Sequence, residues 1–503
     1  MIKHTVRVYP SSVTPPREDQ LAWKLAEVAT DMAAVETDVA AMVANRVIDN
    51  AAVAIAAINR SAVRTAREQA LAHPRSGGAN LFGIDNGRQF SAEWAAWANG
   101  TAVRELDMHD TFLAADYSHP ADNIPPILAV AQQLGRGGAD FVRGVVAAYE
   151  IHVALVTGIC LHKHKKDHIA HLCPAQAAGI GAMLGLPTSI VYQAIQQAVH
   201  VSFTTRQSRK GEISSWKAYA PAHAGKLAIE AVDRAMRGER SPSPIYEGED
   251  SVLAYMLDGP QSEYVVPLPD AGQPHRAILE TYTKEHSAEY QSQALIDLAF
   301  RMRTKVKHWD EVRQITIFTS HHTHYVIGTG SGDPQKFDPA ASRETLDHSI
   351  MYIFAVALED GRWHHVDSYL PERPSRPETV ALWRKIQTVE DPDWTARYHA
   401  ADPAQKAFGG RVMIEFKNGE KLSDELAVAN AHSYGQRPFG RADYLQKFAT
   451  LAGPLVGSEE QARFYDLCER LVDLSPAELR SLNVQLEDGQ VQTTQPTGEG
   501  IFG

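Results

Sequence analysis

The stretch PAQAAGIGAMLGL, residues 174–186, carries small or apolar side chains on nearly every side of the helix that it would form. A helix without a polar face is buried on all sides in a large protein, because none of its faces suits contact with water. The segment HAGKLAIEAVDRAM, residues 223–236, is similarly rich in alanine. Alanine and glycine also allow neighbouring backbones to approach closely. The two segments therefore predict the interior of a packed multi-helix core.

Helical periodicity extends outward from these two segments over residues 19–256. Two apolar stripes at helical spacing are Leu21, Leu25 and Val28, and Val39, Val43 and Val47. The periodicity returns from about residue 443, in YLQKFATLA and EEQARFYDLCERLVDL. We therefore expect the C-terminal part of the chain to complete the helical domain, with a strand or a tail at its end.

A different pattern follows the loop LPDAGQPHR, residues 268–276. A helix is predicted over about 287–304, and RQITIFTSH (313–321) alternates apolar and polar residues as a strand does. The segments SIMYIFAVALEDGRW (349–363) and GRVMIEFKNGEKL (410–422) each look like an apolar run that enters a turn, at Asp-Gly and Asn-Gly respectively. This pattern is typical of a small α/β domain.

The predicted fold class is thus mainly α with an α+β second domain. We place the large all-helical domain at residues 1–278 together with 435–503, and the smaller α/β domain at residues 279–434.

The composition is that of an ordinary globular protein of 503 residues, with 44% hydrophobic and 22% charged residues. The net charge is −12 and no basic stripe stands out, so we expect no nucleic-acid partner. Because the chain is negatively charged overall, a site for an anionic substrate requires a local cluster of basic side chains. The start of the chain lacks the apolar stretch of a signal peptide, and no membrane span is predicted, so we expect a cytoplasmic protein.

Cysteine and glycine patterns bear on cofactors. Cys160, Cys173 and Cys468 form no C-x-x-C pair, which argues against both a disulfide framework and an iron–sulfur cluster. The glycine patterns GIGAMLG (179–185) and GTGSG (328–332) lack the order or the neighbours of nucleotide-binding motifs. We therefore expect an enzyme of this sequence to work without a cofactor.

Three segments are rich in side chains that could act in catalysis or in substrate binding. The first, ELDMHDTFLAADYSHPADNIPP (105–126), places acids, histidines and a threonine before a helix start bounded by proline. Free N–H groups at such a helix start suit a bound anion, but a solvated loop with capping residues is equally compatible with the pattern.

The second segment, LHKHKKDHIAH (161–171), contains four histidines and three lysines just before the predicted core helix. A zinc site would need a third ligand near His168 and His171, and none is evident, so we predict no metal. A cationic rim for an anionic substrate and a solvated basic loop both remain open.

The third segment, TTRQSRKGEISSWKAYAPAHAGK (204–226), places basic residues before the alanine-rich helix. Lys217 enters that helix directly after Trp216, so its ammonium is expected near the interior, where it requires an anion. A lysine whose stem is buried while its ammonium reaches water is the alternative.

Taken together, these segments and two later ones resemble the MmgE/PrpD family over nearly the whole chain. The residues that carry the resemblance are LDMHDT, SHPADNIPPILA, YEIH, KKDHIAHLCPAQAAGIGAMLGL, SSWKAYAPAHAGKLAIEA, YTKEHSAEYQSQALIDLA and FDPAASRETLDHSIMYIFAVALEDG, in this order. The resemblance implies a helical domain and an α/β lid with the active site in the cleft between them. It also implies a homodimer and no organic cofactor.

The family's site residues can be carried over position by position. The expected catalytic residues are Asp107, Thr111, His119, His168, Lys217 and Lys284, and the expected substrate-binding residues are Arg206, Glu289, Tyr290 and His321. Two departures are visible. The stretch FLAADYS between Thr111 and His119 is slightly longer than in decarboxylase-like members, and the last position could match His321, His322 or His324, of which we choose His321.

The resemblance also implies an activity. Decarboxylases of the family place a histidine near Glu289, whereas AEYQSQ here is similar to the methylcitrate dehydratases. We therefore expect a hydro-lyase that converts the tricarboxylate 2-methylcitrate to 2-methyl-cis-aconitate in propionate catabolism (the methylcitrate cycle), with citrate as a further candidate substrate. A cis-aconitate decarboxylase and a non-catalytic carboxylate-binding protein are the alternatives.

Such a dehydration needs a base for the proton next to a carboxylate and an acid for the departing hydroxyl. We expect His119 and His168 to divide these two roles, because the pKa of histidine lies near neutrality. Asp107 would orient one imidazole, Thr111 would hydrogen-bond the substrate, and the lysines would stabilise the charge that develops on a carboxylate.

Overall fold

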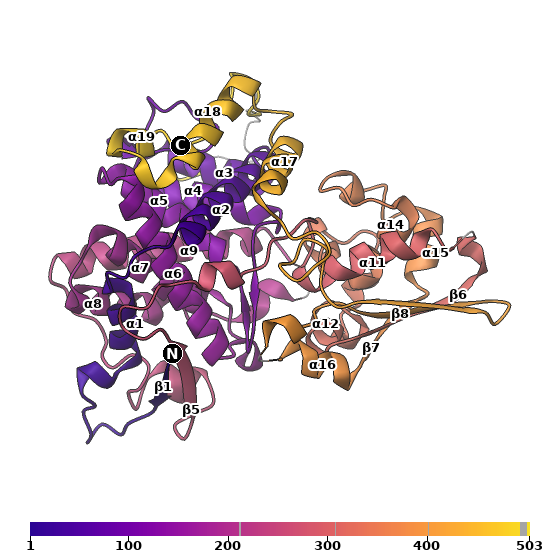
Figure 1. Cartoon of the computed structure of the whole chain (residues 1–503), viewed down its shortest axis with the longest axis horizontal. Coiled ribbons are helices and arrows are strands. Elements are labelled where there is room, and N and C mark those ends of the chain that lie inside the picture. Colours follow the sequence, from indigo (N-terminus) through magenta and orange to yellow (C-terminus); the bar gives the residue numbers. More distant parts are fainter. Residues whose placement is uncertain (211–212, 307, 401, 493–499, 503) are drawn as a thin grey trace.

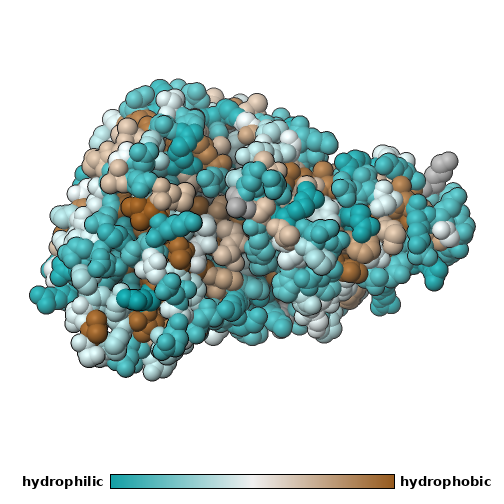
Figure 2. Space-filling model, turned by 60° about the horizontal axis from the view of Figure 1, so that its bottom comes forward, coloured by the Kyte–Doolittle hydropathy of each residue, from teal (hydrophilic) through white to brown (hydrophobic). Residues whose placement is uncertain are grey.

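The computed structural model describes residues 1–210, 213–306, 308–400, 402–492 and 500–502. These residues form a large helical lobe and a smaller α/β lobe that projects from it (Figures 1 and 2). One hydrophobic core runs from Val39 to Ile278 and includes residues 444–484, while a second core is built from residues 288–414. The arrangement agrees with a mainly helical protein that carries a smaller α/β unit. The boundaries at 278/279 and 434/435 stay predictions.

The large lobe is a stack of helices from the first half of the chain. Its helices are α1 (Leu21–Thr30), α2 (Thr37–Ala56), α3 (Ser61–Leu71), α4 (Ala92–Glu105), α5 (Ile124–Gln133), α6 (Gly138–Gly158), α7 (Ile169–Leu184), α8 (Thr188–Ser202), α9 (Trp216–Met236) and α10 (Val252–Met256). The stripes predicted on α1 and α2 are buried, which confirms that part of the prediction.

Helix α7 lies at the centre of this lobe, where every one of its residues is buried. It therefore has the environment predicted from its composition. Gly144 of α6 and Gly179 of α7 lie where the two helices cross. A Cβ atom on Gly179 would stand 2.7 Å from the Cβ of Ala148 and 2.7 Å from the carbonyl oxygen of Gly144. Only glycine allows the two backbones to come this close.

Helices α2 and α6 are long and apolar enough to cross a membrane, judged by length and composition alone. In each of them, however, 78% of the apolar window is buried inside the protein. This is the environment of a core helix.

The C-terminal helices return to the large lobe, as the periodicity predicted. They are α17 (Arg441–Leu451), α18 (Ser458–Glu469) and α19 (Pro476–Arg480). Phe448 of α17 and Phe464 of α18 belong to the same core as α2, and Figure 1 shows the yellow C-terminal helices beside α2, α3 and α4. The described residues 481–492 form no strand, and 493–499, where part of the predicted strand or tail falls, lie outside the described residues.

Two short antiparallel pairs lie in or beside the helical lobe. Strand β1 (Ile2–Arg7) pairs with β5 (Glu263–Leu268), and β3 (Phe112–Leu113) pairs with β4 (Tyr117–Ser118). The sequence analysis did not predict them, because runs this short have too little alternation to be recognised.

The smaller lobe contains a four-stranded sheet of order β7-β6-β8-β9. Its strands are β6 (Val312–Thr319), β7 (Ile386–Glu390), β8 (Gly410–Phe416) and β9 (Lys421–Leu426), and its helices are α11 (Gln293–Arg303), α12 (His321–Val326), α13 (Arg343–Leu346), α14 (Ile350–Asp360), α15 (Pro377–Trp383) and α16 (Pro392–Tyr398). Strands β6 and β7 are parallel, and the other pairs are antiparallel. The strand predicted at β6 and the hairpin turn at Asn418-Gly419 are confirmed.

Two local expectations in this lobe were inaccurate. The apolar run at 349–360 is the helix α14 and not a strand of a hairpin, with Ile350–Leu358 buried on all sides. Ser349 accepts a hydrogen bond from the backbone N–H of Tyr352 at its start, and Gly361 ends it in the left-handed conformation (φ 64°). A short apolar run of this kind fits a buried helix as well as a buried strand. The helix predicted from residue 287 begins only at Gln293, after a 3-10 turn at Tyr290–Ser292.

The close crossing of α6 and α7 yields a stability prediction. We expect Gly179→Ala to destabilise the protein by about 1–3 kcal/mol, because the new methyl group would overlap Ala148 and the backbone of Gly144. Thermal unfolding measures the effect. As a matched control, Gly457→Ala should cost at most about 1 kcal/mol, since a Cβ there meets only Glu487 at 3.8 Å and the change affects only the N-cap of α18. Equal midpoints for the two variants would contradict the close crossing.

Candidate active site

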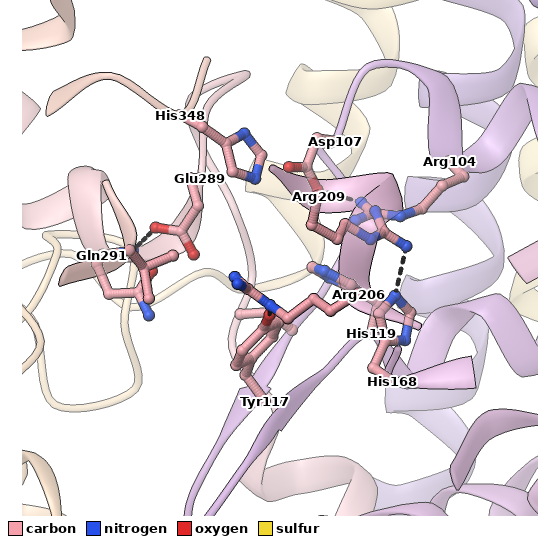
Figure 3. A pocket seen from close by; sticks show the side chains of 12 residues that line it. Arg104, Asp107, Tyr117, His119, His168, Arg206, Arg209, Glu289, Gln291 and His348 are labelled. Atoms are coloured by element: carbon pink, nitrogen blue, oxygen red, sulfur yellow. Dashed lines mark hydrogen bonds and ion pairs between the residues drawn. The ribbon is translucent and has the colours of Figure 1, made fainter. Parts of the chain in front are cut away.

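A narrow pocket lies where the two lobes meet. Its lining from the large lobe is Arg104, Asp107, Thr111, Tyr117, His119, His168, Arg206 and Arg209, and its lining from the smaller lobe is Glu289, Gln291, Val326 and His348. Helix ends position several of these groups: Arg104 is in the last turn of α4, and His168 directly precedes α7. The helical lobe thus presents its helix ends to the smaller lobe (Figure 3).

Asp107 is the electrostatic centre of the pocket. Its carboxylate pairs with Arg104, with Lys284 Nζ at 2.8 Å and with Lys217 Nζ at 3.3 Å, and its side chain is 1% exposed. Burial by itself would raise the pKa of Asp107, but the three cations outweigh burial and hold this pKa well below its ordinary range. Asp107 is therefore a fixed negative charge and not a proton carrier. Its backbone has a positive φ of 50°, unusual for a residue with a side chain.

Lys217 connects the two lobes. It is the second residue of α9, and its Nζ lies 3.0 Å from both carboxylate oxygens of Asp347 in the smaller lobe. The side chain is 3% exposed, so Lys217 reaches the interior and a buried anion, as the first of the two sequence interpretations expected. Lys284 is buried too, and its Nζ also donates to the carbonyl oxygen of Asp107 at 2.9 Å.

The imidazole of His119 is held in one tautomer. Its Nδ1–H donates to the carbonyl oxygen of Asp110 at 3.0 Å, which leaves Nε2 without a partner among the described residues. Burial, followed by the charges of Arg104 and Lys284, holds the pKa of His119 well below its ordinary value. A neutral imidazole with a free Nε2 lone pair is suited to accept a proton.

The imidazole of His168 is in a different situation. Arg209 donates to its Nε2 at 2.9 Å, and its Nδ1 lies 3.2 Å from the hydroxyl of Ser118. Since an arginine can only donate, the Nε2 lone pair of His168 is already in use. Burial lowers the pKa of His168 well below its ordinary value, against a smaller opposing effect of Asp167. His168 is therefore less available for proton transfer than His119.

The smaller lobe contributes two titratable groups. Glu289 accepts a hydrogen bond from the backbone N–H of Gln291 at 2.7 Å, and burial raises the pKa of Glu289 to about 7. His348 forms a dyad with Asp347, which accepts the hydrogen bond of its Nδ1. Burial, together with the charge of Lys217, lowers the pKa of His348 to about 4.

Two models of one family cover most of the chain. The MmgE/PrpD N-terminal domain matches residues 19–265, and the MmgE/PrpD C-terminal domain matches residues 286–472. The chain belongs to the MmgE/PrpD family. The break between the two models, at 265–286, falls in the segment that joins the helical lobe to the smaller lobe.

Several members of the MmgE/PrpD family with assigned activities are similar to this chain. A 2-methylcitrate dehydratase of Salmonella typhimurium is 26% identical over 76% of this chain and 80% of its own length. A mitochondrial 2-methylcitrate dehydratase of Yarrowia lipolytica is 27% identical over 70% of this chain and 68% of its own length. A probable 2-methylcitrate dehydratase of Saccharomyces cerevisiae is 28% identical over 66% of each chain.

The residues carried over from the MmgE/PrpD family fall into four groups. Six of them line the pocket: Asp107, Thr111, His119, His168, Arg206 and Glu289. Lys217 and Lys284 lie outside the pocket lining and form ion pairs with Asp107. Tyr290 is buried in an aromatic cluster with Tyr282 and Phe408, next to the pocket wall. The structure does not bring His321 to the pocket: its side chain is 52% exposed and lies 3.2 Å from Glu390.

Other residues of this MmgE/PrpD chain also line the pocket without having been expected there, above all Arg104, Arg209 and His348. His348 stood in the LDHS part of a segment already quoted, where an acid directly precedes a histidine. Arg104 carried no local signal, because it is one basic residue at the end of an alanine-rich helix.

The basic segment at 161–171 does not form one site. His168 turns to the pocket, His171 bonds the carbonyl oxygen of Ile159 at 2.9 Å, and His164 lies 3.3 Å from Asp258. Their partners differ, so these three histidines share no metal. A second possible set, Asp107 with His109 and His119, has its carboxylate already surrounded by three cations, which would repel a divalent ion.

The charges around Asp107 yield a further stability prediction. We expect Asp107→Asn to lower the free energy of unfolding by about 3–5 kcal/mol, because Arg104, Lys217 and Lys284 would lose a shared buried counterion. Denaturant unfolding measures this. The control Asp233→Asn breaks an exposed pair with Arg237 and should cost at most about 1 kcal/mol. Similar losses in both variants would mean that Asp107 is not the shared counterion.

Proposed function

We propose that this MmgE/PrpD chain is a hydro-lyase that removes water from 2-methylcitrate to give 2-methyl-cis-aconitate, as expected from the sequence. The support is twofold. Relatives named 2-methylcitrate dehydratase match about two thirds or more of the chain. The pocket between the lobes combines several cations with neutral proton carriers, which is what elimination from a polycarboxylate requires.

The observation that carries the proposal is that Arg206, one of the pocket arginines, has no anionic partner among the described residues. Arg206 is mostly buried, and its side-chain hydrogen bond goes to the hydroxyl of Tyr117, at 2.7 Å from Nε. No carboxylate lies within ion-pair distance of Arg206 in the described ranges of the chain. A buried guanidinium without an anionic partner is costly, so it favours a ligand that brings a carboxylate. Arg104 and Arg209 line the same pocket, but Arg104 already pairs with Asp107, and Arg209 lies 3.4 Å from Asp167.

The geometry favours His119 as the base. Its free Nε2 can remove the proton from the carbon next to a carboxylate, while the hydrogen bond from Nδ1 to Asp110 keeps the ring in that tautomer. As the proton leaves, negative charge spreads onto the carboxylate, where the arginines bind it more strongly than in the ground state. His168 would act by orienting Arg209. Thr111, whose hydroxyl donates to the carbonyl oxygen of Ser118 at 2.9 Å, would help to keep that wall in place.

Turnover experiments test the reaction. We expect the metal-stripped protein to convert 2-methylcitrate to a product lighter by one water, identified by mass and by the absorbance of the new conjugated double bond. Citrate and cis-aconitate are incubated in parallel. Release of carbon dioxide from cis-aconitate, without dehydration of 2-methylcitrate, would instead identify a decarboxylase and overturn the proposal.

A substitution tests the base. Removal of the imidazole in His119→Ala should lower kcat by about 100-fold or more, since proton transfer by a positioned side chain typically contributes that factor. His364→Ala, at a partly exposed histidine outside the pocket, serves as the control and should keep the wild-type rate. Wild-type turnover in His119→Ala would remove His119 from the mechanism.

The pocket walls come from both lobes, so the lobes have to part for substrate entry. We propose that they close on the tricarboxylate, which excludes water and strengthens each ionic contact. Solution scattering should show a smaller radius of gyration with a saturating tricarboxylate than without it. Unchanged dimensions would count against closure. The homodimer implied by the family resemblance stays a prediction.

A further inference from the structure

Glu289 occupies the pocket wall opposite the cluster of arginines. It directly precedes the 3-10 turn Tyr290–Ser292, and its backbone N–H donates to the carbonyl oxygen of Asp347 at 3.1 Å. Figure 3 shows the His348 ring extending from the smaller lobe towards Asp107, and the Glu289 carboxylate beside Gln291 on the same side of the pocket. The position of this carboxylate is therefore fixed by the backbone on both sides of it.

The two carboxylates that line the pocket have opposite surroundings. Asp107 is paired with three cations, whereas no lysine or arginine lies within ion-pair distance of Glu289 in the part of the chain that the structure describes. Burial dominates at Glu289 and raises its pKa to about 7, although Lys284 acts in the opposite direction. The pocket thus contains one carboxylate that stays ionised and one that can hold a proton near neutral pH.

A bound tricarboxylate would increase the difference between the pKa values of Asp107 and Glu289. Its negative charges, a few ångströms from Glu289, disfavour a second anion on that wall and raise the pKa of Glu289 further. An ionised Glu289 would repel the substrate, so direct contact with it requires the protonated form. In that form Glu289 has an O–H group to donate.

We propose that Glu289 is the general acid that protonates the departing hydroxyl of the substrate. The inference rests on the proposed dehydration and assigns a residue to its second proton transfer. The substrate C–O bond breaks with its electron pair remaining on oxygen, and that oxygen takes the proton of Glu289 and leaves as water. His119 takes the proton from the neighbouring carbon, and the electrons of that C–H bond form the double bond. The proton on His119 then leaves to solvent, and Glu289 regains one.

This role differs from the substrate binding expected for Glu289 from the family resemblance. A binding residue acts through a hydrogen bond, which a glutamine can also make. A general acid has to give up its proton, which a glutamine amide cannot do. Glu289→Gln, with nearly the same shape, therefore separates the two roles.

The first experiment compares Glu289→Gln with the wild type on 2-methylcitrate. We expect kcat to fall by about 100- to 10,000-fold. Tricarballylate, which resembles citrate without the hydroxyl, should bind to the variant about as well as to the wild type in calorimetry. The control Glu285→Gln changes a nearby glutamate that pairs with Arg437 and lies outside the pocket lining, and it should keep the wild-type rate.

The second experiment uses a substrate analogue in which fluorine replaces the hydroxyl. Fluoride leaves without being protonated, so Glu289→Gln should release fluoride at a rate close to that of the wild type. With the natural hydroxyl substrate, wild-type kcat should fall as the pH rises above the pKa of Glu289 in the complex, because the reactive form is protonated. With the fluoro analogue this decline should disappear.

The outcomes separate the two proposals. If the wild type does not dehydrate 2-methylcitrate, the proposed function and this inference both fail. If the wild type is active and Glu289→Gln keeps its rate, only this inference fails. An equal loss of hydroxyl and fluoride elimination in Glu289→Gln would also overturn it, since Glu289 would then act by positioning and not by donating a proton.

Discussion

The buried carboxylate of Asp107 is the interaction on which the arrangement of the pocket depends. Its three cationic partners come from three parts of the chain: the end of α4, the start of α9 and the segment that joins the two lobes. Through Lys217 and Asp347 the same network reaches the smaller lobe. A charge so deeply buried is stable only with its partners in place, so this carboxylate couples the helix ends of the large lobe to the position of the lid.

The two lobes contribute different kinds of charged and titratable groups to the pocket. The helical lobe supplies the arginines, whose charge is permanent, together with the proposed base His119. The smaller lobe supplies Glu289 and His348, whose pKa values are shifted by burial to about 7 and about 4. Permanent cations suit the binding of carboxylates and the stabilisation of charge that develops on them. Proton transfer needs groups whose charged and neutral forms are close in free energy. Burial without an ion-pair partner provides that condition for the Glu289 carboxylate.

Histidines of one pocket differ because their second nitrogen atoms have different partners. The backbone carbonyl of Asp110 leaves His119 with a free Nε2, while the guanidinium of Arg209 uses the Nε2 of His168. Two residues that look equivalent in a sequence motif thus have different capacities for proton transfer. His168 directly precedes α7, whose backbone approaches that of α6 closely at Gly144 and Gly179.

The sequence by itself determined the features that depend on local pattern. The burial of α7, the helices α1 and α2, the strand β6 and the hairpin turn at Asn418-Gly419 all followed from periodicity and turn residues. The motif residues Asp107, His119 and His168 were also found, because their segments resemble one family.

Tertiary structure alone decided the rest. The apolar run at 350–358 fits a buried strand as well as a buried helix, and only the packing of the smaller lobe shows that it is the helix α14. His321 is turned to solvent, and Arg104, Arg209 and His348 enter the pocket, through contacts between residues far apart in the chain. The charge states of Asp107 and Glu289 differ for the same reason. A carboxylate's pKa is set by the cations and the water around it, and only the folded chain determines which of these lie nearby.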